Sequence, residues 1–310
     1  MKKLLFSLLA LALALCSLSA LADEARDAAL DAVLDALGDD CRATYESLRA
    51  NGPVGMGSRG DAARGVQQTL VEFGQDIVAD GIAGAKTLSA LNAVQSAFNL
   101  PASDALDAEG YAALLPRLLV LRDPDTAEAL LADSLGPEYD YIRGCANQLA
   151  GRFYTARRDF IESQWGDWAA RAEACARPWP GNGQIYKNSA LKGGAVQLTV
   201  RVNGEAENAT LVKVYTSDGD LAAALFIGGE GSATTFLPGG RYAVKDGRGP
   251  QWYGLEEAFG DEGIYEAMTF GDEETVLLAA GRGYTITVNT DAVNDGAQVV
   301  GTEQAGWQGF

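Results

Sequence analysis

Residues 57–100 read GSRGDAARGVQQTLVEFGQDIVADGIAGAKTLSALNAVQSAFNL. Apolar residues recur at three- and four-residue spacings from Asp61 to Phe73, and the same spacing returns between Gly84 and Leu100. This periodicity predicts two amphipathic helices. The segment between them, DGIAG at residues 80–84, has the composition of a tight turn. We therefore expect two helices that pack across one turn.

Four residues are expected to fix this turn: Asp80, Gly81, Gly84 and Thr87. The Asp80 carboxylate can accept backbone N–H groups inside the turn, and the Thr87 hydroxyl can form a hydrogen bond near the start of the second helix. Gly81 and Gly84 are expected to supply left-handed backbone geometry, which glycine adopts at little cost.

The order of these residues resembles the three-helix peptidoglycan-binding domain of bacterial wall enzymes and spore proteins, over about residues 56–115. The shared features are a Gly-Ser-x-Gly entry (57–60), two apolar-Gln pairs (66–67 and 94–95), a glycine stop (73–74), an Asp-Gly-x-x-Gly-x-x-Thr turn (80–87) and a Leu exit (99–100). A short third helix that carries Tyr111, Leu114 and Leu115 completes the expected fold. Ala83, Ala85 and Val94 stand where the family has Phe, Pro and Phe, and each loses buried area.

The resemblance implies a ligand groove beside the two main helices. Five residues are expected to offer hydrogen bonds there, to sugar hydroxyls or stem-peptide groups of peptidoglycan: Arg59, Gln67, Lys86, Asn92 and Gln95. For each of them the alternative is a solvated residue on a helix face or a residue that only stabilises the turn.

The segments on the N-terminal side predict an export signal and a helix. Residues 1–22 read MKKLLFSLLALALALCSLSALA, with two lysines, an apolar run and a small-x-small end, as in a secretory signal peptide. Residues 23–50 predict an amphipathic helix, and the glycine-rich run at 51–57 predicts a linker. No later run is long and apolar enough to span a bilayer, so we expect a secreted or cell-envelope protein.

On the C-terminal side the periodicity changes from helical to strand-like. Residues 122–180 predict a helical hairpin region that ends in a Pro- and Gly-rich boundary. Short alternating runs and glycine-rich turns over 195–290 predict an antiparallel β-sandwich, followed by a polar tail at 291–310. The run FLPGGRY (236–242) resembles, more weakly, part of the carboxypeptidase-regulatory or immunoglobulin-like sandwiches of bacterial surface proteins. The expected fold class is α+β, with helical modules before the β-sandwich.

The expected β-sandwich carries a long aromatic loop that includes Trp252 and Phe259, with acidic residues beside them. Such a loop can stack on sugar rings, in which case the β-sandwich has a carbohydrate partner. Alternatively, the two aromatic residues cap one end of the sandwich core, and any partner of the module, carbohydrate or protein, binds elsewhere.

Composition excludes several classes of function. The chain has 24 Lys+Arg, 42 Asp+Glu and no histidine, which gives a net charge of −18. Ser-His-Asp and Cys-His catalysis need an imidazole base, and zinc sites with histidine ligands are excluded too. Nucleic-acid binding needs a dense basic face that an acidic chain lacks. We expect no catalytic residue, no metal and no cofactor; the alternative is a glycan-cleaving enzyme that uses a carboxylate, Glu162, because glycoside hydrolysis can proceed without histidine.

Three cysteines follow the signal peptide: Cys41, Cys145 and Cys175. An exported chain can join one pair, and Cys145 and Cys175 stand at the two ends of the predicted helical hairpin, so we expect a disulfide between them. The alternative is three reduced, buried thiols.

These features predict a secreted, non-catalytic bacterial cell-wall protein. Its helical module is expected to bind peptidoglycan, and its β-sandwich to be presented at the cell surface. The further alternative to the enzyme is a structural protein whose peptidoglycan-binding fold has lost its ligand.

Overall fold

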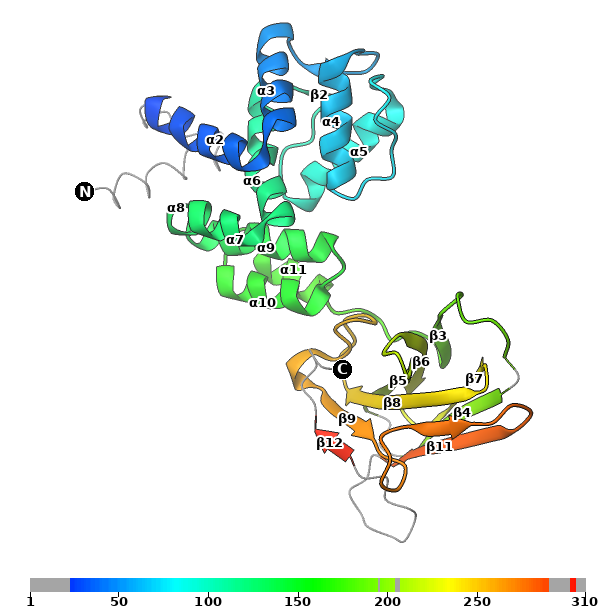
Figure 1. Ribbon diagram of the computed structural model, residues 1–310. Helices are drawn as coiled ribbons and strands as arrows, with labels where there is room; N and C mark the ends of the chain where they lie inside the picture. Colours follow the sequence, from blue (N-terminus) through cyan, green and yellow to red (C-terminus); the bar gives the residue numbers. More distant parts are fainter. Residues whose placement is uncertain (1–22, 195, 204–206, 290–301, 305–310) are drawn as a thin grey trace. The chain divides into compact units, whose positions relative to one another are not determined.

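The structure is a computed structural model, and it describes residues 23–194, 196–203, 207–289 and 302–304 (Figure 1). The predicted signal peptide and most of the predicted 291–310 tail lie outside these residues. The chain divides into two compact units, Met1–Cys175 and Ala176–Phe310. The described part of the first unit is helical and that of the second is built from strands, which agrees with the expected α+β class.

The helical unit contains eleven helical segments and two very short strands among its described residues. In chain order they are α2 (Asp23–Leu37), α3 (Asp39–Asn51), β1 (Val54–Gly55), α4 (Asp61–Glu72), α5 (Ala85–Ala97), β2 (Ala105–Leu106), α6 (Ala108–Arg122), α7 (Pro124–Ala127), the π-helical turn η1 (Glu128–Ala132), α8 (Asp133–Leu135), α9 (Pro137–Leu149), α10 (Phe153–Ser163) and α11 (Trp168–Ala174).

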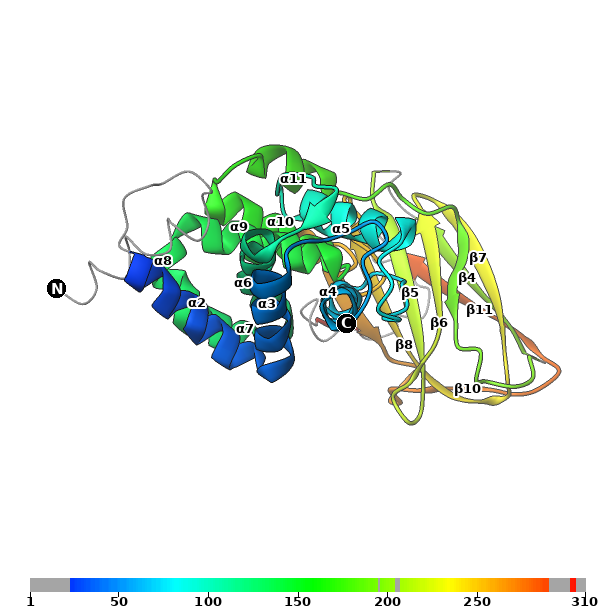
Figure 2. The same ribbon diagram turned by 90° about the horizontal axis from the view of Figure 1, so that it is seen from above.

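The helix predicted over 23–50 is divided in two at Gly38, whose φ of 94° lies in the left-handed region. This break lets α3 leave the direction of α2 and lie beside α4, as both views show (Figures 1 and 2). The segment predicted as a linker also belongs to the unit, because β1 pairs with β2 across 50 residues of sequence, with Val54 opposite Leu106.

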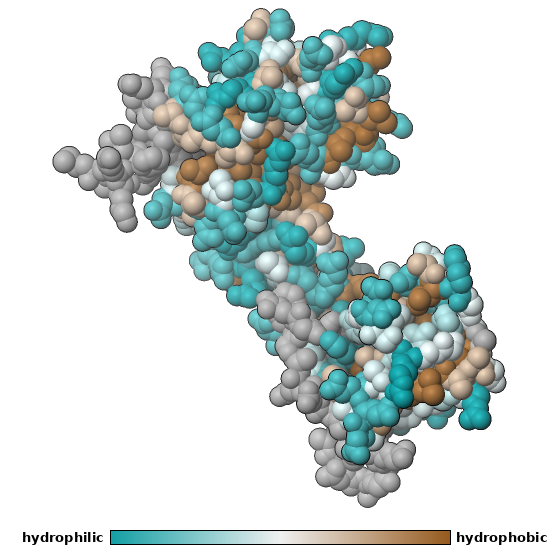
Figure 3. All heavy atoms as spheres, in the orientation of Figure 1, coloured by the Kyte–Doolittle hydropathy of each residue, from teal (hydrophilic) through white to brown (hydrophobic). Residues whose placement is uncertain are grey.

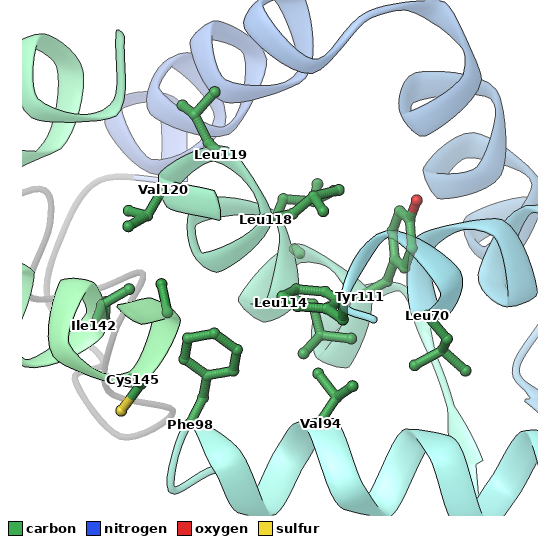
Figure 4. Close-up of a cluster of buried hydrophobic side chains, with 14 of the residues drawn as sticks. Leu70, Val94, Phe98, Tyr111, Leu114, Leu118, Leu119, Val120, Ile142 and Cys145 are labelled. Carbon is green, nitrogen blue, oxygen red and sulfur yellow. The ribbon is translucent and has the colours of Figure 1, made fainter. Parts of the chain in front are cut away.

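Helix α6 continues through Pro116. A proline inside a helix removes one backbone hydrogen bond, at a cost of about 3 kcal/mol. The turn around Pro116 is buried, so packing offsets this cost. In Figure 4, Leu114 and Leu118 of α6 lie between Leu70 of α4 and Ile142 of α9.

One hydrophobic core therefore extends through the helical unit, from Leu30 to Cys175. The three segments expected from the sequence, 23–50, 56–121 and 122–180, all contribute to it. They form one compact unit, so the expected boundaries near residues 50 and 121 do not divide it.

The second unit contains ten described strands in two sheets. Their bounds are β3 (Gly183–Lys187), β4 (Val196–Asn203), β5 (Ala209–Thr216), β6 (Leu221–Gly228), β7 (Gly231–Leu237), β8 (Gly240–Gly249), β9 (Ile264–Met268), β10 (Val276–Leu278), β11 (Gly283–Asn289) and β12 (Thr302–Gln304), with a 3₁₀ turn η2 (Gly260–Glu262). One sheet has the order β12-β9-β8-β5-β6-β3, with β10 also paired to β8, and the other has the order β11-β4-β7.

The two sheets share a core, to which Leu198 and Val200 of β4 and Val212 and Leu225 of β5 and β6 contribute. Figure 2 shows the β4, β7 and β11 layer on one side and the β5, β6 and β8 layer on the other. The expectation of an antiparallel arrangement is wrong at one pair, because β11 runs parallel to β4. A parallel pair requires a crossover connection, and here the chain passes through the other sheet between β4 and β11.

Candidate functional site

The Asp80 turn is held by the side chain of Gln67, which extends from α4. Gln67 Nε2 donates to Asp80 Oδ1 (3.0 Å), to Thr87 Oγ1 (3.1 Å) and to the carbonyl oxygen of Ile82 (3.2 Å), while Gln67 Oε1 accepts from the Gly81 N–H (2.8 Å). Asp80 Oδ1 also accepts from the Ile82 N–H (2.8 Å). The hydrogen bond from Gln67 lowers the pKa of Asp80 and fastens the turn to α4.

The two glycines of the turn differ. Gly81 has a φ of 77°, in the left-handed region, as expected. Gly84 has a φ of −115°, which is extended backbone at the position before the first residue of α5. The expected left-handed geometry at Gly84 is therefore wrong, and any residue can adopt its conformation.

Gln67 and Gln95 do not face a ligand groove, so that expectation is wrong for both. Their exposed fractions are 2% and 5%. Gln95 Nε2 donates to Ser103 Oγ (3.0 Å), and Gln95 Oε1 accepts from the Ser103 N–H (3.2 Å). Both residues lie on the inward faces of their helices, and a buried amide is stable there because its polar atoms are bonded within the fold.

The other three expected site residues are placed differently. Arg59 and Lys86 are exposed, and the Arg59 backbone forms a β-bridge with Ile82 in the turn. Asn92 is half-buried, and its Oδ1 atom is buried without a hydrogen-bond partner among the described residues. Of the five, Arg59 and Lys86 are thus the residues whose charged ends can meet a ligand at the surface.

A pocket of about 490 Å³ lies between α3 and α4, against the segment that enters the Asp80 turn. Its lining residues are Asp40, Cys41, Thr44, Gly65, Gln68, Thr69, Val71, Glu72, Ile77, Val78, Ala79 and Tyr111. None of the five expected binding residues belongs to this lining. The volume falls within the range of small-molecule sites in proteins.

Gly65 brings the two helices of this pocket together. A Cβ atom added at Gly65 would lie 2.0 Å from Thr44 Oγ1 and 2.9 Å from Thr44 Cγ2. Sequence reasoning missed this site because one wall of it, formed by Asp40, Cys41 and Thr44, comes from α3, outside the segment of resemblance. One signal was present, since a glycine inside a helical pattern often marks a close approach of two backbones.

The floor of the pocket is polar but uncharged. Tyr111 OH and Thr69 Oγ1 lie 2.9 Å apart and are hydrogen-bonded. Burial raises the pKa of the Tyr111 hydroxyl and also that of the Cys41 thiol, so both groups keep their protons at neutral pH. These groups offer hydrogen bonds without charge.

The rim of the pocket carries two carboxylates and an apolar wall. Asp40 and Glu72 are exposed, and Glu72 Oε2 lies 3.7 Å from Arg122 Nε. Val78 is 77% exposed and belongs to the apolar part of the lining. Figure 3 shows hydrophobic residues on the surface of the helical unit around α4 and α5, where Met56 and Ile82 are also exposed.

Glu162, the carboxylate of the enzyme alternative, lies on the exposed side of α10. Its carboxylate is 3.3 Å from Arg143 Nη2 and 4.0 Å from Arg158 Nη2. It does not line the α3–α4 pocket. Within the described ranges, no group of three or more Cys, Asp and Glu side chains could hold a metal ion.

The Cys145–Cys175 disulfide expected from the sequence is not formed in the structure. Cys41, Cys145 and Cys175 are all buried, and in the described part of the chain none of them forms a disulfide. Burial raises the pKa of the Cys145 thiol to about 11, which keeps it protonated. Because disulfide formation requires a thiolate, the packing of this residue disfavours the reaction.

The aromatic loop of the second unit faces inward. Trp252 and Phe259 are buried with Phe226 of β6 in a small core on the side of the sheet away from the shared core. Trp252 contacts Phe226 and Phe259 edge-on, at centroid distances of 5.1 and 5.6 Å. The two residues therefore cap the sheet, and their rings are not available for stacking on sugars.

The same unit contains a buried carboxylate whose protonation is expected to change its stability. Asp246 on β8 is 1% exposed, lies opposite Glu266 of β9, and has its Oδ2 atom 3.1 Å from Arg248 Nε. Burial, with a smaller contribution from Glu266, raises the pKa of Asp246 from 3.8 to about 6. Folding thus favours the protonated form of Asp246. The contribution of this group to the free energy of unfolding is complete below the unfolded pKa of 3.8 and is lost as pH rises through about 6.

We expect Asp246→Asn to remove this dependence on pH. The wild-type β unit should lose about 2 kcal/mol between pH 4 and pH 7 through this group, and the variant should be the more stable protein at pH 7. The measurement is thermal unfolding from pH 4 to pH 8, followed by tryptophan fluorescence. Identical pH profiles for the two proteins would contradict the prediction.

The three departures from the peptidoglycan-binding pattern do not open the core. Ala83 and Val94 are fully buried, and Phe98 packs edge-on against Phe73 with ring centroids 5.6 Å apart. Ala85 is exposed in the first turn of α5, where a small residue leaves no void.

No helix among the residues described is long and apolar enough to cross a membrane. No known protein family, curated protein or solved structure matches this chain.

Proposed function

We propose that this chain is an exported, non-catalytic bacterial cell-wall protein that binds peptidoglycan through its helical unit and presents its β unit at the cell surface. The observation that carries the proposal is the α3–α4 pocket. It joins uncharged hydroxyl groups, an exposed amide, two carboxylates and an apolar wall in about 490 Å³. A site of this size and mixed polarity suits one sugar ring or a short peptide.

The resemblance supports the proposal in a changed form. The Asp80 turn and the two glutamines have structural roles, since Gln67 ties the turn to α4. Because the turn is fixed to α4, the segment before it, Ile77, Val78 and Ala79, lies along the pocket. We therefore place the ligand between α3 and α4, and assign the family-like residues to the scaffold that holds this surface.

The two alternatives have less support. Glu162 lies among arginine side chains on the exposed side of α10, outside the pocket, and no observation pairs it with a second carboxylate around a cavity. A scaffold that has lost its ligand would not need the pocket, yet Gly65 and the exposed Gln68 and Val78 maintain an open, mixed surface there.

Wall binding is tested by sedimentation with purified, insoluble peptidoglycan. We expect a chain that begins at Asp23 to enter the pellet with a dissociation constant between micromolar and millimolar, or about 4–8 kcal/mol of binding free energy. Because Gln68 and Val78 line the pocket with exposed side chains, the double variant Gln68→Ala/Val78→Ser should bind about tenfold more weakly, a loss of about 1.4 kcal/mol.

Arg59→Ala and Lys86→Ala serve as matched controls. Both residues are exposed and flank the turn, but neither lines the pocket. Wild-type protein that stays in the supernatant at all concentrations would refute wall binding. Loss of binding in the two control variants, with the pocket variant unaffected, would move the site to the Arg59 and Lys86 surface.

A further inference from the structure

We infer that the α3–α4 pocket recognises a primary amine at the end of an aliphatic side chain, carried on a short peptide. The inference rests on the proposed function and specifies which part of the wall is bound. The lining contains two carboxylates, Asp40 and Glu72, and no lysine or arginine. The charge of the pocket therefore favours a cationic group and opposes an anionic one.

The two carboxylates are not equivalent. Glu72 has a cation beside it, because Arg122 Nε lies 3.7 Å from its Oε2 atom. Asp40 forms no ion pair with any residue in the described part of the chain, so its charge is not compensated by a neighbouring side chain. Asp40 is in the first turn of α3, where its backbone carbonyl accepts from Thr44 Oγ1 (2.8 Å). We assign the amine contact to Asp40.

The apolar part of the lining explains why the expected group has an aliphatic stem. Val71, Ile77, Val78 and Ala79 line the pocket together with the carboxylates. An extended chain of methylene groups can cover such a surface while its charged end reaches the rim, as lysine side chains do on proteins. Sugar rings carry hydroxyl groups around their edges and gain less from this wall.

Peptidoglycan provides this chemistry in its peptide stems, which contain a diamino residue whose side-chain amine is free wherever no cross-link has formed. The saccharide strands carry no such amine, since their amino groups are acetylated. An amine-selective pocket would therefore direct the protein to uncross-linked peptides.

The test uses two probes with the full chain from Asp23. The first is purified wall, either native or treated with acetic anhydride to acetylate its free amines. The second is the soluble peptide Nα-acetyl-lysyl-D-alanine, with its side-chain amine free or acetylated, titrated by NMR. We expect acetylation to weaken binding of both probes at least tenfold, and Asp40→Asn to have the same effect on the unacetylated probes.

Asp39→Asn is the matched control. It removes the same charge from the same helical turn, but Asp39 does not line the pocket. Equal weakening by Asp39→Asn and Asp40→Asn would overturn the inference, because the effect would then be one of general charge. Unchanged binding to acetylated wall would overturn it as well, while leaving wall binding intact. If native wall is not bound but the free-amine peptide is, and Asp40→Asn abolishes that binding, the inference holds and the proposed wall function fails.

Discussion

Gly65→Ala is expected to force α3 and α4 apart and to destabilise the helical unit by about 2–3 kcal/mol. Alanine is the better helix former by about 1 kcal/mol, so propensity alone predicts the opposite sign. The added methyl group would lie 2.0 Å from Thr44 Oγ1, well inside contact distance, and overpacking of this kind costs more than the propensity gains. The measurement is chemical unfolding followed by circular dichroism at 222 nm, where the helical unit dominates the signal.

A second substitution separates the clash from other effects. Thr44→Ala removes the two closest atoms and leaves a contact of 3.0 Å to Thr44 Cβ. The double variant Thr44→Ala/Gly65→Ala should therefore be less destabilised than the sum of the two single variants. Additive effects, or an increase in stability for Gly65→Ala alone, would show that the helices are not in close contact at this position. Gly65→Ala should also weaken wall binding, because Gly65 lines the pocket.

Gln67→Ala is expected to cost about 3 kcal/mol, or ~6–12 °C in the midpoint of thermal unfolding of a unit of this size. The side chain is buried, and its loss removes four hydrogen bonds that join α4 to the turn. It also leaves the buried N–H of Gly81 without its acceptor, and an unsatisfied buried donor is costly.

The neighbouring glutamine provides the control for this prediction. Gln68 occupies the next position of α4 but is exposed, so Gln68→Ala should change the midpoint by less than about 2 °C. Its effect should instead appear in wall binding. Equal stability of the two variants would contradict the structural role of Gln67, and a binding defect in Gln67→Ala without a loss of stability would restore that residue to a ligand site.

Local chemistry accounts for the parts of this fold that the sequence predicts well. The apolar periodicity of residues 61–73 corresponds to α4. The local part of the turn is the hydrogen bond from the Ile82 N–H to Asp80 and the left-handed φ of Gly81, while Gln67 ties the turn to α4 over a longer separation. The alternating run around Leu198 corresponds to β4, and the later alternating runs fall on described strands. In each case the decisive interactions are a turn hydrogen bond, a φ angle or a one-sided hydrophobic surface, and these can be read from spacing alone.

Features that depend on contacts between distant segments are predicted wrongly from the sequence or are not predicted at all. The period of a helix shows which residues face inward, but an inward glutamine and an outward one look alike when both neighbour apolar residues. Spacing therefore leaves Gln67 and Gln95 open between a ligand contact and a structural role, and their burial decides for the structural role. The sequence does not predict strand β3, because its five residues show little alternation of polar and apolar side chains. These residues form a strand because they pair with β6. The parallel pairing of β11 with β4 depends on the path of the chain between the two sheets.

Residue types and short-range contacts are enough to predict the α+β order of the elements and the position of the Asp80 turn, and the absence of histidine excludes histidine chemistry. Three features follow only from the packing of distant segments. Helix α3 lies against α4 at Gly65, one core unites residues 30–175, and a pocket opens between helices from separate segments. A pocket depends on the distance between two surfaces that are far apart in the chain. That distance is set by the packing of many side chains together, and no local pattern records it.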